Sequence, residues 1–391
     1  MTIQLLVTDR NLTVVGDPID GWTKVTCDLT FNAPASGSVV LPARPEVMQL
    51  LQPGNRLIVI RDGGIWCAGP MEEPQNYEWD LTSSPDPGTV TVSFSDDLAR
   101  VAGYLTYPEP TKDFTSQDTI TDRVRTFSGQ TAETIIRTLI DENCGPGALA
   151  TRRIEGLVLD DVAGVGSTRS LSTRLEPLLD ACRTVAATDG LGFRTRQIGD
   201  QIRFGVYAPA DRTSTARFSK GLNNLRAVRF TLGAPTATSE LVQGGGDPDD
   251  AATPPNVRVY VEVASGAAAD WYRVEKLVDK TGTLDDTGGE LTQAGTQALG
   301  TDGPQASLST VTVDTDDLQA GRDFGLGDKV TVVLPTGLEV ADLVQTIRLE
   351  ATPEQGELVT SVIGDSDKTT VSATVRVVRD LARRLGRLET R

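Results

Sequence analysis

The residues best suited to chemistry in this chain are its carboxylates, because the sequence has 54 Asp and Glu residues and no histidine. The lack of histidine excludes Ser-His-Asp and Cys-His catalysis, His-ligated zinc and histidine-based pH switching. Carboxylate clusters can instead bind Ca²⁺ where their spacing suits its oxygen coordination. The acidic clusters are Asp247/Asp249/Asp250, Asp285/Asp286 and Asp314/Asp316/Asp317. None has EF-hand spacing, so we interpret them as solvated loops and expect no metal and no cofactor.

The chain also lacks the motifs of nucleotide binding and hydrolysis. Its Gly-x-Gly patterns, at residues 190–192 and 325–327, precede expected strands rather than helices, which disfavours phosphate binding. No Walker A, HExxH or GxSxG sequence is present. Paired carboxylates could serve a glycosidase, but nothing local singles out such a pair, and an aromatic content of 5% is low for a sugar-binding cleft. The sequence therefore favours a protein that is not an enzyme.

Composition indicates a globular, β-rich chain. Its 391 residues suffice for two to four domains, and its net charge of −17 disfavours direct binding to nucleic-acid phosphates. No run of 18 apolar residues exists, so no membrane insertion is expected, and residues 1–9 are interpreted as a first strand rather than a signal peptide. The cysteines are Cys27, Cys67, Cys144 and Cys182. Their apolar contexts and lack of C-x-x-C spacing predict buried, reduced thiols and assembly in a cytoplasm.

One hairpin pattern occurs twice, and the rest of the chain can be arranged around it. Residues 53–71 and 326–344 align without a gap at an offset of 273 positions, each with a turn, a strand, a Gly-containing turn and a second strand. The motif positions are Gly54, Asn55, Leu57, Val59 and Gly64 in the first copy, and Gly327, Asp328, Val330, Val332 and Gly337 in the second. Two unrelated hairpins could share this pattern of turn and strand residues. The alternative is an internal duplication of a small β-barrel domain.

The pattern of strands and helices predicts a mainly β fold with an α+β insertion. We expect a first tube-like β-barrel over 1–103, an α+β middle domain over 104–220, and a second barrel over 221–365 with an inserted β/α segment at about 244–305. Within the middle domain, helices are expected at 131–140, with Thr131 as N-cap, and at 172–188.

Residues 366–391 are expected to form a C-terminal helix with a basic surface. Heptad spacing relates its apolar positions, which are Val371, Thr374, Val378, Leu381, Leu385 and Leu388. This a/d pattern over about three repeats predicts a self-associating coiled coil, and these residues are the candidate oligomer interface. An ordinary amphipathic helix packed on its own domain is the alternative.

Several of these segments resemble a known family. The run 324–332, FGLGDKVTV, is similar to the "FGLGD-x-V" signature of siphophage tail proteins of the Gp37-like type. Residues 290–299, 218–225 and 51–54 resemble further motifs of that family, in the same order along the chain. The first-barrel signature of the family is usually "F-x-G-x-I". This chain departs from it, with Cys67 in place of the aromatic residue and Met71 in the last position.

The resemblance implies a tail-tip or baseplate hub in the virion. Such proteins carry two tube-like β-barrels per chain and form homotrimers, so that three chains present six similar barrels in a closed ring. The ring would join distal tail or tail tube proteins above it to other tail-tip proteins or fibres below it. Genomic DNA would pass through the ring without specific binding.

Two further hypotheses concern the role of the net charge and an alternative function for the chain. An acidic lumen would repel the DNA duplex from the wall and leave it free to slide, although the same charge on the outside would serve only solubility. A surface glycan-binding adhesin or a cell-wall hydrolase component of the tail is the alternative function. An adhesin needs aromatic-lined sugar sites and a hydrolase needs a clustered acid/base set, and neither is evident in the sequence.

Overall fold

The computed structural model describes residues 3–71, 76–81, 87–117, 123–245, 257–280, 283, 286–303, 305–354 and 356–364. The described chain is mainly β and divides into two compact units. Unit 1 holds the described residues up to Pro209 together with Gly325–Gly327 and Thr346–Ser361, and unit 2 holds Ala210–Phe324, Asp328–Gln345 and the described residues from Val362 onward. None of the described helices is long and apolar enough to cross a membrane.

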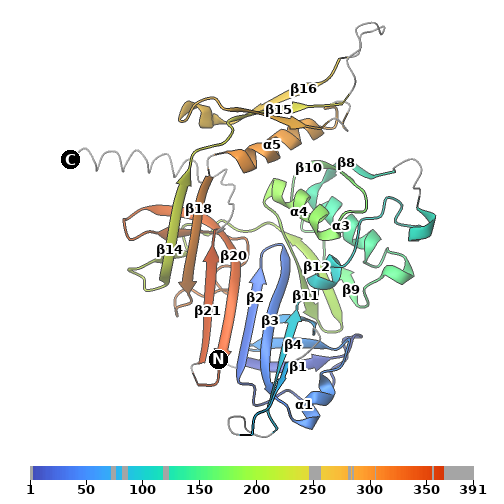
Figure 1. Cartoon of the computed structure of the whole chain (residues 1–391), viewed down its shortest axis with the longest axis vertical. Helices are drawn as coiled ribbons and strands as arrows, with labels where there is room; N and C mark the ends of the chain where they lie inside the picture. Colours follow the sequence, from blue (N-terminus) through green and yellow to red (C-terminus); the bar gives the residue numbers. More distant parts are fainter. Residues whose placement is uncertain are drawn as a thin grey trace. The chain divides into compact units, whose positions relative to one another are not determined.

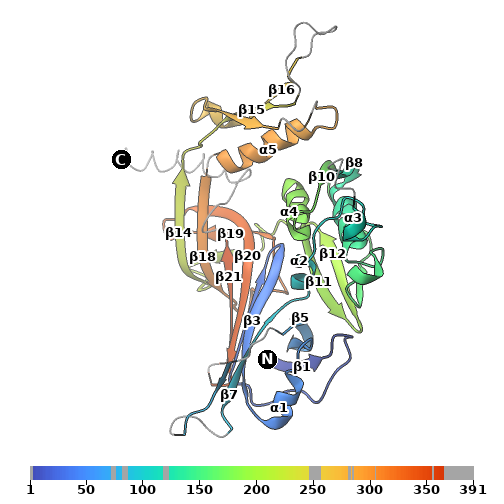
Figure 2. The ribbon, with the colours of Figure 1, turned by 45° about the vertical axis from the view of Figure 1, so that its right-hand side comes forward.

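The N-terminal part of unit 1 consists of strands and two short helices (Figures 1 and 2). Its elements are β1 (Ile3–Thr8), β2 (Lys24–Thr30), β3 (Ala33–Pro42), α1 (Pro45–Leu50), β4 (Arg56–Arg61), β5 (Gly64–Pro70), β6 (Asn76–Glu78), β7 (Thr89–Ser95) and α2 (Leu98–Ala102). Strands β1, β4 and β5 form one antiparallel sheet, and β2, β3, β7 and β6 pair in that order in another. Alternate side chains of β7, Val90, Val92 and Phe94, are buried, which is the period of two expected for a strand with one face on a core.

Strands expected at 3–8, 24–31, 37–41, 56–61, 65–71 and 89–95 are present, whereas the strand expected at 11–15 is only an isolated bridge between Thr8 and Val14. The predicted barrel does not close. Among the described strands, the order of every sheet ends in strands that do not pair with each other, so no sheet closes into a barrel. Instead, β5 of one sheet contacts β2 and β7 of the other: Cys67 lies against Cys27, and the Cα of Gly69 approaches the backbone at Ser95. The prediction failed because inward and outward side chains alternate identically in a barrel wall and in two sheets that share a core.

The second part of unit 1 contains both helices and strands. Its elements are β8 (Arg125–Thr131), α3 (Ala132–Asn143), β9 (Leu157–Leu159), β10 (Thr168–Thr173), α4 (Leu178–Asp189), β11 (Gly192–Ile198) and β12 (Gln201–Tyr207), with short 3₁₀ turns at Phe114–Ser116 and Ala150–Arg152. Strands β8 and β10 pair with each other, and β11, β12 and β9 form a three-stranded sheet. The Thr131 side chain accepts a hydrogen bond from the N–H of Thr134, which confirms the predicted N-cap.

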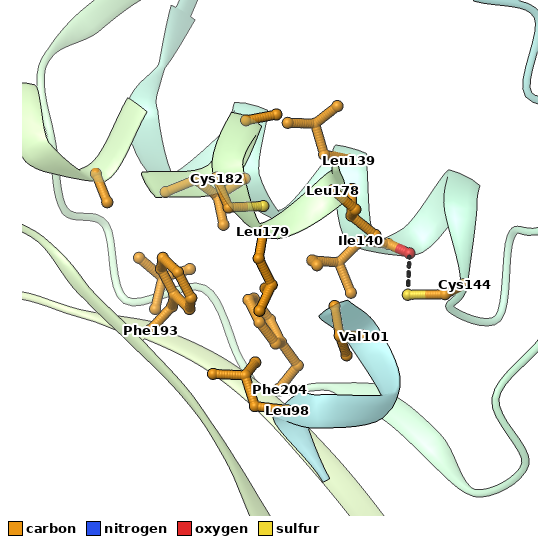
Figure 3. Close-up of a cluster of buried hydrophobic side chains, with 14 of the residues drawn as sticks. Leu98, Val101, Leu139, Ile140, Cys144, Leu178, Leu179, Cys182, Phe193 and Phe204 are labelled. Carbon is orange, nitrogen blue, oxygen red and sulfur yellow. Dashed lines mark hydrogen bonds between the residues drawn. The ribbon is translucent and has the colours of Figure 1, made fainter. Parts of the chain in front are cut away.

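Helices α3 and α4 pack with β11 and β12 around one apolar cluster (Figure 3). The labelled side chains of this cluster are Leu98, Val101, Leu139, Ile140, Cys144, Leu178, Leu179, Cys182, Phe193 and Phe204. Because Leu98 and Val101 belong to α2, this core also ties α2 to the α+β region. All four cysteines of the chain are buried and free, as the sequence predicted.

The helix predicted at 172–188 begins six residues later than expected. Residues Thr168–Thr173 form strand β10, Leu175 has a φ of +50°, and the helix starts at Leu178 after Pro177. Proline fixes its own φ and disfavours helical geometry in the residue before it, so a helix begins after it rather than running through it.

Unit 2 contains two β regions. Its elements are β13 (Arg217–Ser219), β14 (Leu225–Gly233), β15 (Ser239–Gln243), β16 (Tyr260–Ala264), a 3₁₀ turn (Gly266–Ala269), β17 (Glu275–Asp279), α5 (Glu290–Asp302), β18 (Gln305–Val313) and β19 (Lys329–Val333). Strands β20 (Glu339–Thr352) and β21 (Gly356–Ile363) have residues in both units. In unit 2, β14 pairs with β18, and β19 lies between β13 and the first half of β20.

The inserted segment of unit 2 is a three-stranded sheet covered by α5 on one face. Its strand order is β16-β15-β17, and Leu291 of α5 is buried against Val242 of β15. Gly295 allows this close approach, because a Cβ there would lie 2.6 Å from the Val263 side chain and 2.9 Å from that of Val242. The insertion thus begins with β15 at Ser239, earlier than the predicted residue 244.

Candidate functional site: two hairpins and a crevice

The first predicted motif forms the turn and strands of the β4–β5 hairpin. Gly54 has a φ of +84°, a conformation that glycine adopts at little cost, and Asn55 donates its side-chain N–H to the carbonyl of the last residue of α1 at 2.8 Å. Leu57 and Val59 of β4 are fully buried, and Gly64 begins β5. The turn before β4 and the strand that follows are therefore those predicted from the sequence.

The second predicted motif forms the β19–β20 hairpin. Gly327 has a φ of +80°. The Asp328 carboxylate accepts a hydrogen bond from the backbone N–H of Ala210 at 2.8 Å. Val330 and Val332 of β19 are fully buried, and Gly337, in the turn between the strands, has a φ of +85°. The side chain after the first glycine thus ties each hairpin to another segment: Asn55 donates to the end of α1 just before it, and Asp328 accepts from the distant Ala210.

The two hairpins also share their register. The pairs in the first are Arg56↔Pro70, Leu57↔Gly69, Ile58↔Ala68 and Val59↔Cys67, and those in the second are Lys329↔Leu343, Val330↔Asp342, Thr331↔Ala341 and Val332↔Val340. Adding 273 to each number of the first set yields the second set. The register of the first hairpin then shifts between Val59 and Ile60, whereas the second continues to Val333↔Glu339. Common ancestry of the two copies stays a prediction.

A buried ion pair distinguishes the first hairpin from the second. The Arg56 guanidinium, which is 1% exposed, donates from Nε to Asp97 Oδ1 at 3.1 Å, pairs through Nη2 with Oδ2, and donates from Nη1 to the Thr8 hydroxyl at 3.0 Å. Burial raises the pKa of Asp97, and the charge of Arg56 opposes that shift. At the position equivalent to Arg56, the second hairpin has the partly exposed Lys329.

The carboxyl of Asp96, next to this ion pair, is held in a poorly solvated position. Burial raises its pKa to about 7, against hydrogen bonds from backbone N–H groups that lower it. One of these is the N–H of Leu98 at the start of α2, 3.2 Å from Asp96 Oδ1. Around neutral pH, Asp96 therefore exchanges between a neutral and a charged form.

Asp96 lines a crevice of about 390 Å³ in unit 1, between the N-terminal sheets and the α+β region. One wall is formed by residues 65–68 of β5 and the other by residues 193–198 of β11, with the β2–β3 turn at one side. Two buried polar atoms of lining residues, Trp66 Nε1 and Gln197 Oε1, have no hydrogen-bond partner among the described residues. Such atoms are costly in a folded protein unless something else supplies their partners.

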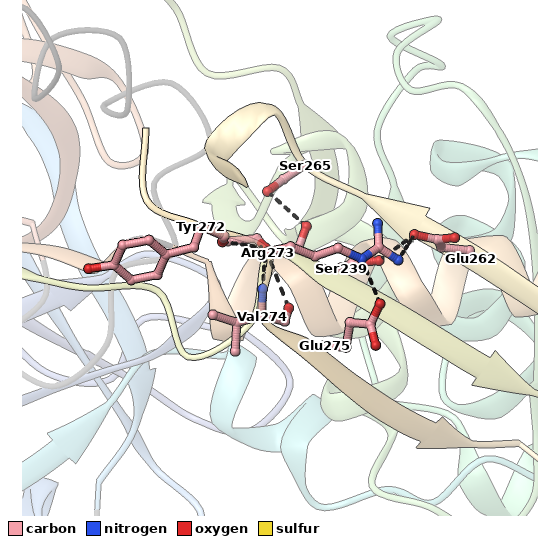
Figure 4. Close-up of polar contacts among 8 residues, drawn as sticks. Ser239, Glu262, Ser265, Tyr272, Arg273, Val274 and Glu275 are labelled. Atoms are coloured by element: carbon pink, nitrogen blue, oxygen red, sulfur yellow. Dashed lines mark hydrogen bonds and ion pairs between the residues drawn. The ribbon is translucent and has the colours of Figure 1, made fainter. Parts of the chain in front are cut away.

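The sheet of the insertion presents a polar surface on the face opposite α5 (Figure 4). There the Arg273 guanidinium lies between Glu262 and Glu275, with N···O distances of 2.6 Å to each, and Ser239 also donates to Glu262 at 2.7 Å. These charges are largely exposed, so the network orders the surface of the sheet but adds little to stability.

Most of the remaining predicted site residues lie outside the part of the chain that the structure describes. The interface positions Val371, Thr374, Val378, Leu381, Leu385 and Leu388 lie outside the described residues, as do Asp247, Asp249, Asp250 and Asp285. Asp314 accepts hydrogen bonds from the N–H of Ala320 and so stabilises a turn. Among the described residues, no group of three or more His, Cys, Asp or Glu side chains is arranged to hold a metal ion.

The sequence interpretation missed the Arg56–Asp97 pair and the crevice. The partners of the ion pair are 41 positions apart, and the residues around the crevice come from segments between Leu29 and Leu326. One available indication was Arg56 itself, a charged residue that precedes an apolar strand in an otherwise buried motif.

Three of the solved proteins that resemble the chain in fold are phage tail proteins. A 43 kDa tail protein of prophage MuSo2 from Shewanella oneidensis has a TM-score of 0.58 at 14% identity. The alignment covers 92% of this chain and 98% of that protein's chain. A tail protein from Neisseria meningitidis MC58 has a TM-score of 0.53 at 14% identity, with 94% and 97% covered. The prophage tail protein gp18 from Listeria monocytogenes EGD-e has a TM-score of 0.52 at 11% identity, with 98% and 99% covered. No curated protein matches the chain in sequence.

These likenesses define the class of fold: the chain is folded as phage tail proteins are, over nearly its whole length. The family follows from the sequence. The chain belongs to the family described as Siphovirus ReqiPepy6 Gp37-like protein, which it matches over residues 3–365. The resemblance noted in the sequence is thereby confirmed.

Proposed function

We propose that the chain is a structural protein of a phage tail and acts as a tail-tip or baseplate hub. Its family and its tail-protein fold support a place in the tail. The observation that carries the hub assignment is the hairpin that occurs twice in one chain with the same register. A homotrimer of such a chain presents six similar hairpins, which suits contact with a six-fold tail tube on one side and three-fold partners on the other.

In this proposal the trimer is a closed ring held partly by residues 371–388. The ring lies at the tail tip of the virion, between the tail tube or distal tail proteins and other tip proteins or fibres. Three copies carry three times the net charge of −17, which suits a lumen that repels duplex DNA and lets it slide. If the lumen is acidic, the full chain should not retain duplex DNA even at low salt. Salt-sensitive DNA binding would contradict this part of the proposal.

Native mass spectrometry of the full chain tests the hub assignment. We expect a trimer, and we expect Leu381→Asp to raise its dissociation constant because a charge buried at a d position costs several kcal/mol. Ser372→Asp, which places the same charge at an outward heptad position, is the matched control and should leave the trimer intact. A wild-type chain that stays monomeric at micromolar concentration would overturn the hub proposal. Equal trimers in both variants would show that other surfaces hold the ring.

A further inference from the structure

Strand β11 is an edge strand whose outer hydrogen-bonding groups face the crevice of unit 1. Thr195 pairs with Phe204, and Gln197 with Ile202, across β12. The backbone N–H of Ile202 donates to the carbonyl of Gly156, and the carbonyl of Phe204 accepts from the N–H of Asp160. Both bonds lie on the side of β12 that faces away from β11. In an antiparallel ladder, residues opposite each other direct their N–H and C=O groups either both toward or both away from their partner strand. The N–H and C=O groups of Thr195 and Gln197 therefore point away from β12.

The first position along this edge is already occupied by a side chain that imitates a strand. Asn32, in the β2–β3 turn with a φ of +54°, donates from Nδ2 to the carbonyl of Leu191 at 2.9 Å and accepts at Oδ1 from the N–H of Phe193 at 2.8 Å. A primary amide thus makes the two bonds that a neighbouring strand would make to residues two apart. The next positions along the edge, Thr195 and Gln197, have no such partner among the described residues.

The walls of the crevice combine apolar side chains with the charged side chains of Asp96, Arg194 and Arg196. Ile65 and Ile198 both line it and are 44% and 48% exposed, although each is a large apolar side chain. The volume of about 390 Å³ is at the lower end of ligand sites, so it suits a short extended stretch.

We propose that this crevice binds an extended polypeptide segment of another tail protein, which adds as a strand to the β11 edge beyond Asn32. Its backbone bonds with Thr195 and Gln197, and its apolar side chains lie on Ile65 and Ile198. This is recognition by strand addition, in which the main chain provides affinity and alternate side chains provide selectivity. Only the assignment of the donor as another tail protein rests on the proposed function. The capacity to bind a peptide does not.

Fluorescence anisotropy with defined peptides tests the proposal on the full chain. The probes are labelled, end-blocked eight-residue peptides in which Thr alternates with Val, Ile, Leu or Phe, and the same peptides N-methylated at every residue, so that neither edge of the strand keeps an N–H donor. We expect saturable binding of the first set and none of the second, because N-methylation removes the donors that an added strand requires. No binding in the first set, or equal binding in both, would overturn the proposal, whether or not the chain forms trimers.

Variants of the edge locate the binding. Thr195→Pro removes an N–H that faces the crevice and leaves the ladder to β12 intact, so it should weaken binding about tenfold, while Thr195→Val should not. Ile198→Asp should weaken binding similarly, and Val162→Asp, at an exposed site 69% accessible elsewhere in unit 1, is its control. Unchanged circular dichroism keeps the comparison valid for each variant. Retained binding in both Thr195→Pro and Ile198→Asp would overturn the location, and self-association abolished by Thr195→Pro would assign the donor to a second copy instead.

Discussion

The hairpins β4–β5 and β19–β20 have one register but different surroundings. In unit 1, β4 pairs with β1 antiparallel over six residues, whereas in unit 2, β19 pairs with β13 parallel over three. Both copies share local alternation and the glycine turn before the first strand, whereas the turn between the strands has two residues after Arg61 and five after Val333. The strand beside each hairpin depends on how the preceding chain arrives, which differs between the copies. The hairpin is thus the part of this fold that local sequence specifies.

Each hairpin also makes one very close contact that only a glycine allows, but the glycine lies in the hairpin in the first copy and outside it in the second. At the position of Gly69, a Cβ would lie 2.2 Å from the carbonyl oxygen of Ser95, so only glycine fits. The equivalent position in the second hairpin is Asp342, and there the glycine is on the other side of the contact: a Cβ on Gly364 would lie 2.1 Å from the Leu308 carbonyl oxygen and 2.9 Å from the Asp342 carboxylate. A close contact needs a small residue on one side only, and each copy solves this differently.

The largest expected difference between the hairpins concerns their ion pairs. Asp97→Ala leaves the Arg56 guanidinium buried without its counter-charge and should lower the free energy of unfolding by about 3–5 kcal/mol. Glu339→Ala breaks the exposed pair between Glu339 and Arg217 in the second hairpin and should cost at most about 1 kcal/mol. Urea unfolding of the full chain measures both. Similar losses in the two variants would show that the copies do not differ in this respect.

A second difference is the pH dependence that Asp96 brings to the first hairpin. Its pKa rises from 3.8, the ordinary value of an aspartate side chain, to about 7 in the folded chain, so the folded state holds the proton more tightly between these values. The contribution of Asp96 to the free energy of unfolding is therefore most favourable below pH 4 and falls as the pH rises to about 7. Asp96→Asn should leave stability nearly unchanged at pH 4 and raise it by about 2–4 kcal/mol at pH 8.

The control for this prediction is a carboxylate with the opposite shift. Hydrogen bonds from Ser116 and Thr115 lower the pKa of Asp113, which is exposed at the start of a 3₁₀ turn. Asp113→Asn should therefore lose stability slightly at neutral pH and not gain it. A gain for Asp96→Asn that is the same at pH 4 and pH 8 would mean that the substitution acts through packing rather than through the proton.

Local patterns predicted much of the fold. Strand alternation, the Gly-containing turns, the Thr131 cap and the buried cysteines were all visible in the sequence, because each depends on residues within a few positions of one another. The barrel prediction failed at the next level, since closure depends on which strands meet after the chain turns back. The start of α4 was missed because the apolar stripe was extended through Pro177 and Leu175.

The candidate site was predicted only in part, for the same physical reason. The motif residues lie at turns and strands that their own neighbours specify, although Gly64 lies in strand β5 and its counterpart Gly337 lies in the turn between two strands. The crevice depends on the β2–β3 turn, β5 and β11 meeting in unit 1, and Asn32 completes the β11 edge from a distance of about 160 positions in the sequence. No periodicity or spacing connects such segments.

The smallest expected difference concerns the two turn glycines. Both Gly54 and Gly327 have positive φ, so alanine at either should cost about 1–2 kcal/mol in backbone strain. A Cβ at Gly54 meets nothing within 4 Å, whereas one at Gly327 would lie 2.3 Å from the ring of Phe31, in unit 1. Gly327→Ala should therefore lower the urea midpoint more than Gly54→Ala, and Phe31→Leu should reduce that excess by making room. If the two alanine variants lose the same stability, the Phe31 ring yields freely and the turns are equivalent in energy as well as in conformation.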